Sequence, residues 1–151
     1  METEGVERVL MLVKAMPHVG RERGELVCCA GVTEQREWRR QYPVRFRFLT
    51  DESMFQRWHW VEYHWRLPKG DRRPESRRVD EGSIVKGHEM KSAHRGSFLA
   101  RLILPGVKSA EERGQTLTLV RPKTDNIRFS WKKDSSGDRN GNPAIRQCRS
   151  A

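Results

Sequence analysis

The 151-residue sequence lacks the features that usually identify secreted, membrane-spanning and metal-binding proteins. Two of its three cysteines, Cys28 and Cys29, are adjacent and the third, Cys148, lies near the end, which fits neither a zinc site nor a disulfide framework. The first residues are acidic where a signal peptide is basic, and their apolar run is far shorter than the roughly 20 residues of a membrane span. We therefore expect a cytoplasmic protein with reduced thiols, no metal, no cofactor and no membrane partner.

Catalytic motifs are also scarce. The sequence has no glycine-rich phosphate loop, no zinc-protease motif and no nucleophile elbow. Glu62 and His64 share one face of a predicted strand, and with Glu75 they are weak candidates for acid-base chemistry, which needs such groups within hydrogen-bond reach. Coincidences of this kind are common in a charged protein. A small nuclease or glycosylase is therefore an alternative, and we favour a protein without catalytic activity.

Positive charge is what the sequence has in excess. Its 30 basic and 20 acidic residues give a formal net charge of +10, and 22 of the basic residues are arginines. A guanidinium donates hydrogen bonds to phosphate or carboxylate in a planar fork and also stacks on flat rings. A large positive net charge favours binding to nucleic acid, although it also serves solubility.

Residues 36–66 hold four of the five tryptophans, both tyrosines and seven arginines. The first part of this segment alternates with the two-residue period of a strand. One face carries Trp38, Arg40, Tyr42, Val44, Phe46 and Phe48, and the other carries Arg39, Gln41, Pro43, Arg45 and Arg47. This density of arginine and aromatic rings predicts a surface that binds an anionic partner.

The second part of the segment predicts another strand with two different faces. The core face carries His59, Val61, Tyr63, Trp65 and Leu67, and the opposite face carries Trp58, Trp60, Glu62, His64 and Arg66. Two tryptophans on a solvent-facing surface are costly unless they bind something. We expect exposed rings available for stacking, with cover by a neighbouring sheet or helix as the alternative for one of them.

Residues 68–83 follow this strand and are rich in Pro, Gly and charge, so we predict a long loop without a regular element. Its arginines are positioned to contact phosphates, and its acidic residues to orient them; these are Arg72, Arg73, Arg77, Arg78, Asp71 and Glu75. Long loops inside compact domains are often functional. A solvated loop without a ligand is the alternative.

The remaining elements follow from shorter patterns. Residues 9–13 are continuously apolar, which is typical of a strand buried on both faces. Residues 25–32 predict a second strand, although a short helix fits their small apolar side chains equally well. Apolar side chains at helical spacing predict a helix over residues 91–104, and alternation predicts strands over residues 115–121 and 126–132.

Together these elements predict an α+β fold with a mostly antiparallel β-sheet or a partly open barrel of the OB or PUA-like kind. We expect one or two short helices, the second ending at Gly114. Residues 1–132 are predicted to form a single domain. Residues 133–151 have too little apolar surface to offset the entropy of ordering, so we expect a disordered basic and polar tail.

Three short blocks are more specific than the composition. They are GELVCCAG at residues 24–31, WRRQYPVRFR at residues 38–47 and RPES at residues 73–76. With their spacing over roughly residues 8–131, they resemble a family of uncharacterised prokaryotic proteins. Residues of this sequence that match the family pattern are Glu25, Cys28, Ala30, Gly31, Trp38, Arg40, Tyr42, Pro43, Phe46, Arg47, Arg73, Pro74, Glu75 and Ser76. The resemblance implies no activity.

We therefore predict a nucleic-acid-binding domain in which arginines contact phosphates and exposed tryptophans stack on the bases of a single strand of RNA or DNA. The residues predicted to make these contacts are Trp38, Arg40, Tyr42, Arg45, Arg47, Trp60, Arg66, Arg72, Arg73 and Arg77. A module that binds an acidic protein is a further alternative, because Trp and Arg are also favoured at protein interfaces.

Overall fold

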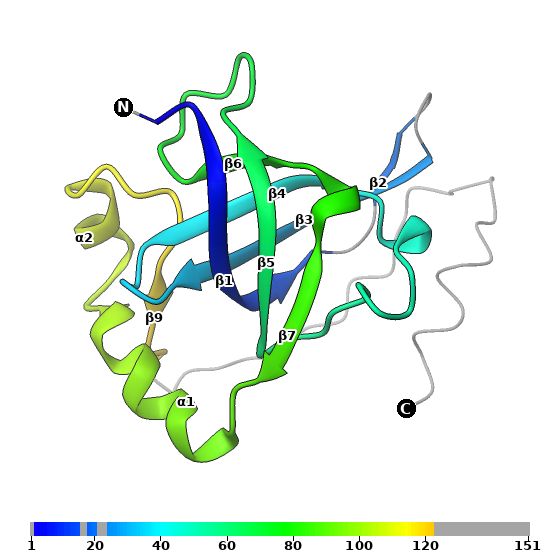
Figure 1. Cartoon of the computed structure of the whole chain (residues 1–151). Coiled ribbons are helices and arrows are strands. Elements are labelled where there is room, and N and C mark those ends of the chain that lie inside the picture. The colour runs from blue at the N-terminus through cyan, green and yellow to red at the C-terminus, as the bar shows by residue number, and fades with distance from the viewer. Residues whose placement is uncertain (1, 16–17, 21–23, 123–151) are drawn as a thin grey trace, which may run out of the picture. The chain divides into compact units, whose positions relative to one another are not determined.

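The computed structural model describes residues 2–15, 18–20 and 24–122. Five strands form a barrel at its centre (Figure 1): β1 (Glu4–Lys14), β3 (Gly24–Thr33), β4 (Trp38–Val44), β5 (His59–Arg66) and β6 (Ser76–Val79). They pair in the order β1-β3-β4-β6-β5, and β5 pairs back onto β1, so the barrel is closed. The β4-β6 pair is parallel and the others are antiparallel. The predicted α+β, barrel-like fold is confirmed.

Smaller elements surround the barrel. Strands β2 (His18–Gly20) and β7 (Val85–Glu89) extend the sheet at β3 and β5. The helices α1 (Ser92–Leu99) and α2 (Val107–Glu111) lie on one side with the β8-β9 pair, Ile103–Leu104 and Leu119–Val120 (Figure 1). Single 3-10 turns occupy Phe46–Phe48, Glu81–Ser83 and Ala100–Leu102. No helix among the described residues is long and apolar enough to cross a membrane.

The core has two layers, one inside the barrel and one between the barrel and α1. Val9 and Met11 of β1 belong to the inner layer, and Leu10 and Leu12 belong to the outer layer. All four are at most 4% exposed. The prediction of a strand buried on both faces is therefore confirmed, except that Val13 at its end is exposed. Residues 25–32 also form the predicted strand, not the alternative helix.

On β5, the predicted core face is confirmed for Val61, Tyr63 and Trp65, which point into the barrel. Leu67, by contrast, lies beyond the strand and is exposed. The prediction of an exposed Trp60 is wrong. Trp60 is only 6% exposed and packs edge-on against Phe98 of α1, with 5.7 Å between ring centroids. The helix covers the barrel face that alternation alone assigns to solvent.

The predicted faces of β4 are also wrong, because a bulge interrupts its alternation. Val27 and Cys29 of β3, two residues apart, pair with Val44 and Gln41, which are three residues apart. An extra residue in one strand reverses the faces beyond it. Val44 therefore turns inward and joins the inner core, whereas Gln41, 2% exposed, and Tyr42, 48% exposed, keep the alternation that begins at Trp38.

The long loop predicted over residues 68–83 is interrupted by β6, which fills the gap between β4 and β5 and completes the barrel. Two other boundaries differ from expectation. The predicted helix over residues 91–104 ends as an α-helix at Leu99, and residues 115–121 contribute only the two residues of β9. The strand predicted over residues 126–132, the domain boundary at residue 132 and the predicted tail lie outside the described residues.

Candidate nucleic-acid interface

Two sequence blocks, one around Arg40 and one around Ser76, form neighbouring strands. Arg40 of β4 lies opposite Ser76 of β6, and Gln41 lies opposite Arg77. The backbone N–H of Arg40 donates to the carbonyl oxygen of Glu75 at 2.8 Å. Because successive side chains on a strand point to opposite faces, Arg40 and Ser76 face outward and Gln41 and Arg77 face inward.

Glu75 is a buried carboxylate beside the outward-facing Arg40. Its Oε1 lies 3.9 Å from Nη2 of Arg40 and accepts a hydrogen bond from the hydroxyl of Thr116. The Thr116 oxygen in turn accepts a hydrogen bond from Arg40 Nη2 at 3.2 Å. Glu75 is only 5% exposed. This buried carboxylate therefore holds the guanidinium of Arg40 in place.

A cavity of about 710 Å³, which we call the β4-β6 groove, lies over these outward-facing side chains. It is lined by Leu26, Arg40, Tyr42, Pro43, Pro68, Lys69, Gly70, Asp71, Arg73, Ser76, Arg77 and Arg78. Five of these residues are basic and only Asp71 is acidic. The groove is therefore strongly electropositive, and its apolar lining comes from one leucine, one tyrosine and two prolines.

Tyr42 is the exposed aromatic residue of the groove. It shares the outward face of β4 with Arg40, 48% of the residue is accessible, and the peptide bond that follows, Tyr42-Pro43, is cis. None of the four tryptophans among the described residues offers an exposed ring of this kind. Trp58 is partly buried between the guanidiniums of Arg57 and Arg95, and the other three are at most 8% exposed.

Asp71 and Arg73 form a forked ion pair at the rim of the groove. Nε and Nη2 of Arg73 donate to the two carboxylate oxygens of Asp71 at 2.9 and 2.7 Å. These hydrogen bonds lower the pKa of Asp71 well below its usual range and raise the pKa of Arg73. The single acid of the groove is therefore engaged in orienting Arg73, whose side chain remains 45% exposed.

Several cations near the groove have no such partner. Arg66 and Arg78 lie directly opposite each other on β5 and β6, an arrangement of like charges that destabilises a sheet. Glu4 lies across from Arg66 on β1, yet neither arginine forms an ion pair with any described residue. The same is true of Lys69 and Arg72, which are both exposed. An anionic ligand would offset this repulsion.

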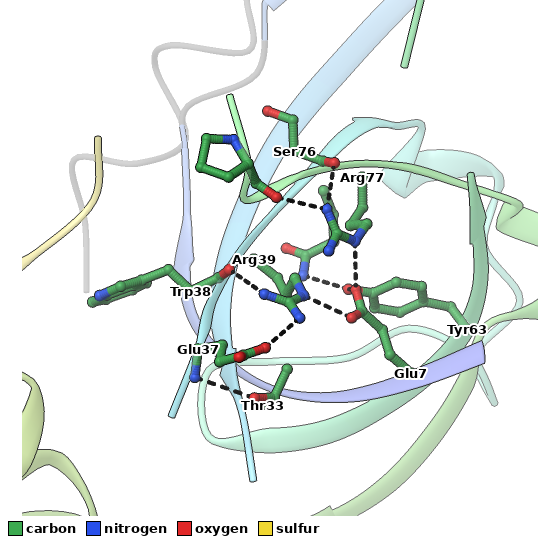
Figure 2. Close-up of polar contacts among 10 residues, drawn as sticks. Glu7, Thr33, Glu37, Trp38, Arg39, Tyr63, Ser76 and Arg77 are labelled. Carbon is green, nitrogen blue, oxygen red and sulfur yellow. Dashed lines mark hydrogen bonds and ion pairs between the residues drawn. The ribbon is translucent and has the colours of Figure 1, made fainter. Parts of the chain in front are cut away.

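Inside the barrel, below the groove, Glu7 joins three other polar side chains (Figure 2). Its carboxylate accepts from Arg39 Nε at 2.7 Å and from the hydroxyl of Tyr63 at 3.0 Å. The Tyr63 oxygen accepts from Gln41 Nε2 at 2.7 Å, and Nε of Arg77 lies 3.5 Å from Glu7 without hydrogen-bond geometry. Glu7 thus connects β1 to β4, β5 and β6.

The two buried arginines of this network, Arg39 and Arg77, differ in how far their neighbours offset the cost of burying a charge. Burial lowers the pKa of Arg39, but hydrogen bonds to Glu7 and Glu37 more than offset that cost and raise it overall. The pKa of Arg77 is lowered by burial and by the charge of Arg39. Burial and the Glu7 charge raise the pKa of Tyr63 well above its usual value, so this phenol stays protonated. Arg77 is the under-compensated charge.

The structure brings together Arg40, Tyr42, Arg73 and Arg77 at the groove, with Arg72 in the adjoining cavity. It separates the other predicted contacts from them. Arg45 and Arg66 line a different cavity, where Arg45 is paired with Glu81, and Arg47 is exposed on the Phe46–Phe48 turn. Trp38 and Trp60 are buried in the outer core, so their predicted role in stacking is wrong.

Lys69 and Arg78 complete the groove. Arg78 is one of the loop arginines predicted to reach phosphates, whereas Lys69 carries no sequence signal beyond its charge. Glu62 and His64 are exposed on β5, and His64 lines the cavity beside Arg66 instead of the groove. No three His, Cys, Asp or Glu side chains among the described residues are grouped so as to hold a metal.

Comparison with known proteins gives one match. A family model described as a domain of unknown function (DUF8758) matches residues 5–104. This stretch runs from β1 through β8 and includes both strands of the groove. No curated protein and no solved structure matches the chain.

Proposed function

The chain belongs to this DUF8758 family, whose description names no activity, and we propose from the chemistry of the β4-β6 groove that it binds single-stranded nucleic acid. The observation that carries the proposal is an exposed tyrosine in a cavity with five cations and one acid, the acid being already paired to Arg73. Phosphates neutralise the cations and a base stacks on Tyr42.

Charge pairing supports a ligand with several negative charges. Arg40 and Arg73 are each held by a carboxylate, so their positions are fixed before a ligand arrives. Lys69 and Arg78 have no ion-pair partner among the described residues. Fixed donors reduce the entropy lost on binding, and unpaired cations supply the salt-dependent release of counterions that drives association with nucleic acid.

A single strand fits the groove better than a duplex. The bases of a duplex are stacked on each other, whereas unpaired bases are free to stack on an aromatic side chain. One exposed ring on a groove of about 710 Å³ suits one or two nucleotides, with the adjoining backbone following Lys69 and Arg78. Stacking is tolerant of sequence because every base has a flat face.

The test is a set of fluorescence-anisotropy titrations at low and at physiological salt. The probes are single-stranded RNA and DNA of mixed sequence, the matching duplexes and a glutamate-rich peptide. We expect both single strands to bind more tightly than the duplexes and all affinities to fall as salt rises. Binding of the peptide alone would instead assign the groove to an acidic protein partner.

A further inference from the structure

A second cavity adjoins the β4-β6 groove and has a different chemistry. This recess has a volume of about 660 Å³ and shares Pro68, Asp71, Arg73 and Arg77 with the groove. It extends past the Arg73 loop toward Arg36 and Arg72. A strand bound in the groove therefore has the recess directly beside it.

Three guanidiniums in the recess have no hydrogen-bonded carboxylate among the described residues: those of Arg36, Arg72 and Arg77. Arg36 stacks on the ring of Phe98 and donates Nε to its carbonyl oxygen. Arg72 is exposed and makes no hydrogen bond, ion pair or ring contact with the described residues. The recess therefore offers positive charge that its own side chains do not neutralise.

Most acids in the recess are already engaged. Glu37 is paired with Arg39, Asp71 with Arg73, and Glu75 with Arg40 and Thr116. Glu2 is the remaining carboxylate of the lining. Arg36 and Arg72 therefore have no carboxylate partner among the described residues, Arg77 has only Glu7 at 3.5 Å without a hydrogen bond, and the balance of the recess favours an anion.

Arg77 is the buried donor at this site. It is 9% exposed, and its guanidinium plane is fixed by stacking on Trp65, with Cζ 4.1 Å from the ring centroid. Nη1 donates to the carbonyl oxygens of Pro74 and Ser76 at 2.8 and 2.9 Å, and Nε faces Glu7. Nη2 makes no hydrogen bond with a described residue, so it is the guanidinium nitrogen left to donate to a ligand.

We propose that the recess binds a phosphate monoester through Arg77 and Arg72, and that this monoester is the terminal phosphate of the strand in the groove. The inference rests on the proposed function. A terminal monoester carries a charge of about −1.5 to −2 near pH 7 and has three oxygen acceptors, whereas each internal diester carries a single charge. The unpaired charge of the recess matches the monoester.

The test compares one short oligonucleotide with a 5′-phosphate, a 3′-phosphate or hydroxyls at both ends. Wild type is expected to bind one of the phosphorylated forms about tenfold or more tightly than the hydroxyl form, the range of a hydrogen bond to a charged group. Arg77→Lys and the exposed Arg72→Ala are each expected to lose this preference. Arg72→Ala, which lies outside the groove, should still bind the hydroxyl form within about twofold of wild type, and Arg8→Lys on β1 is the control for Arg77→Lys.

The outcomes separate the two proposals. Equal affinity for the three forms would overturn the terminal-phosphate site and leave the function of the groove intact. Failure of every form to bind would overturn both. If Arg77→Lys does not fold, Arg72→Ala decides alone, and a preference unchanged in Arg72→Ala would contradict the proposed contact. A free 5′-mononucleotide that binds as tightly as the phosphorylated strand would assign the recess to free monoesters instead.

Discussion

Arg40 and Glu75 are 35 positions apart in sequence and adjacent in the barrel, where the backbone N–H of Arg40 donates to the carbonyl oxygen of Glu75 and the side chains lie 3.9 Å apart. This contact joins the block around Trp38 to the Arg-Pro-Glu-Ser block. It also closes the barrel, because β4 and β6 meet there in parallel. The groove is formed where the two blocks meet.

Stacking on Tyr42 is expected to contribute a large part of the affinity for a single strand. Tyr42→Ala should weaken binding by about 1–3 kcal/mol, and Tyr42→Phe, which keeps the ring, should bind nearly as well as wild type. Phe48→Ala is the matched control, because Phe48 is an exposed ring outside the groove. Equal losses in the Tyr42→Ala and Phe48→Ala variants would show that stacking in the groove is not specific.

Removing a single cation of the groove is expected to reduce the salt dependence of binding by the contribution of one phosphate contact. Lys69→Ala and Arg78→Ala should each lower the slope of log K against log salt concentration by about 0.7, the value for one phosphate of a single strand. Lys108→Ala on α2 removes an exposed lysine elsewhere and should leave the slope unchanged. The slopes come from titrations at four or more salt concentrations, and an equal change in all three variants would favour net charge over the groove.

Gly31 lies where β1 and β3 approach closely. A Cβ atom at this position would lie 2.3 Å from the carbonyl oxygen of Leu10. Gly31→Ala should therefore destabilise the fold by about 1–3 kcal/mol or more. Gly96→Ala is the control, since no atom beyond its chain neighbours and the backbone of its own helix lies within 4 Å of the new Cβ, and alanine favours helix α1 by roughly 0.5–1 kcal/mol. Urea denaturation of both variants tests the prediction, which fails if Gly31→Ala is as stable as wild type.

The buried thiol of Cys29 is expected to make the fold less stable at alkaline pH. Burial, and next the charge of Cys28, raises the pKa of its thiol from 9.0 to about 12. The fold therefore favours the protonated thiol, so this contribution is complete below pH 9 and is lost as pH rises toward 12. In that window the free energy of unfolding should fall by about 1.4 kcal/mol per pH unit from this group alone.

Cys29→Ala removes this titration, so its stability between pH 9 and 11 should depend less on pH than that of wild type. Cys28→Ala removes the smaller cause of the shift and keeps the buried thiol, so it should retain most of the pH dependence. Chemical denaturation at several pH values gives the comparison. Parallel profiles for wild type and Cys29→Ala would mean that the thiol does not contribute to the alkaline transition.

The alternation of apolar residues was sufficient to predict which side chains are buried where the pattern lies within one strand. Val61, Tyr63 and Trp65 alternate on β5 and do line the barrel, and the apolar run at Val9 to Leu12 is buried on both faces as predicted. In each case the signal lies within a few residues, because successive side chains of a strand point to opposite faces.

The failures involve partners that are distant in sequence. Trp60 is buried because α1 packs over it, and β6 forms because its two partner strands leave a gap that only β6 fills. The bulge that turns Val44 into the barrel depends on the register with β3. Glu7 receives its hydrogen bonds from residues 32 and 56 positions away, so its role has no local pattern.

The most direct measurement of the central claim is photochemical crosslinking of the bound single strand, followed by trypsin digestion and mass spectrometry. Trypsin is expected to cut after Arg40 and Arg45, which releases residues 41–45 as a peptide whose single aromatic residue is Tyr42. This peptide is expected to carry the dominant crosslink and to lose it in Tyr42→Ala. A dominant crosslink at Phe48, or at Phe129 and Trp131, with residues 41–45 unmodified would contradict it.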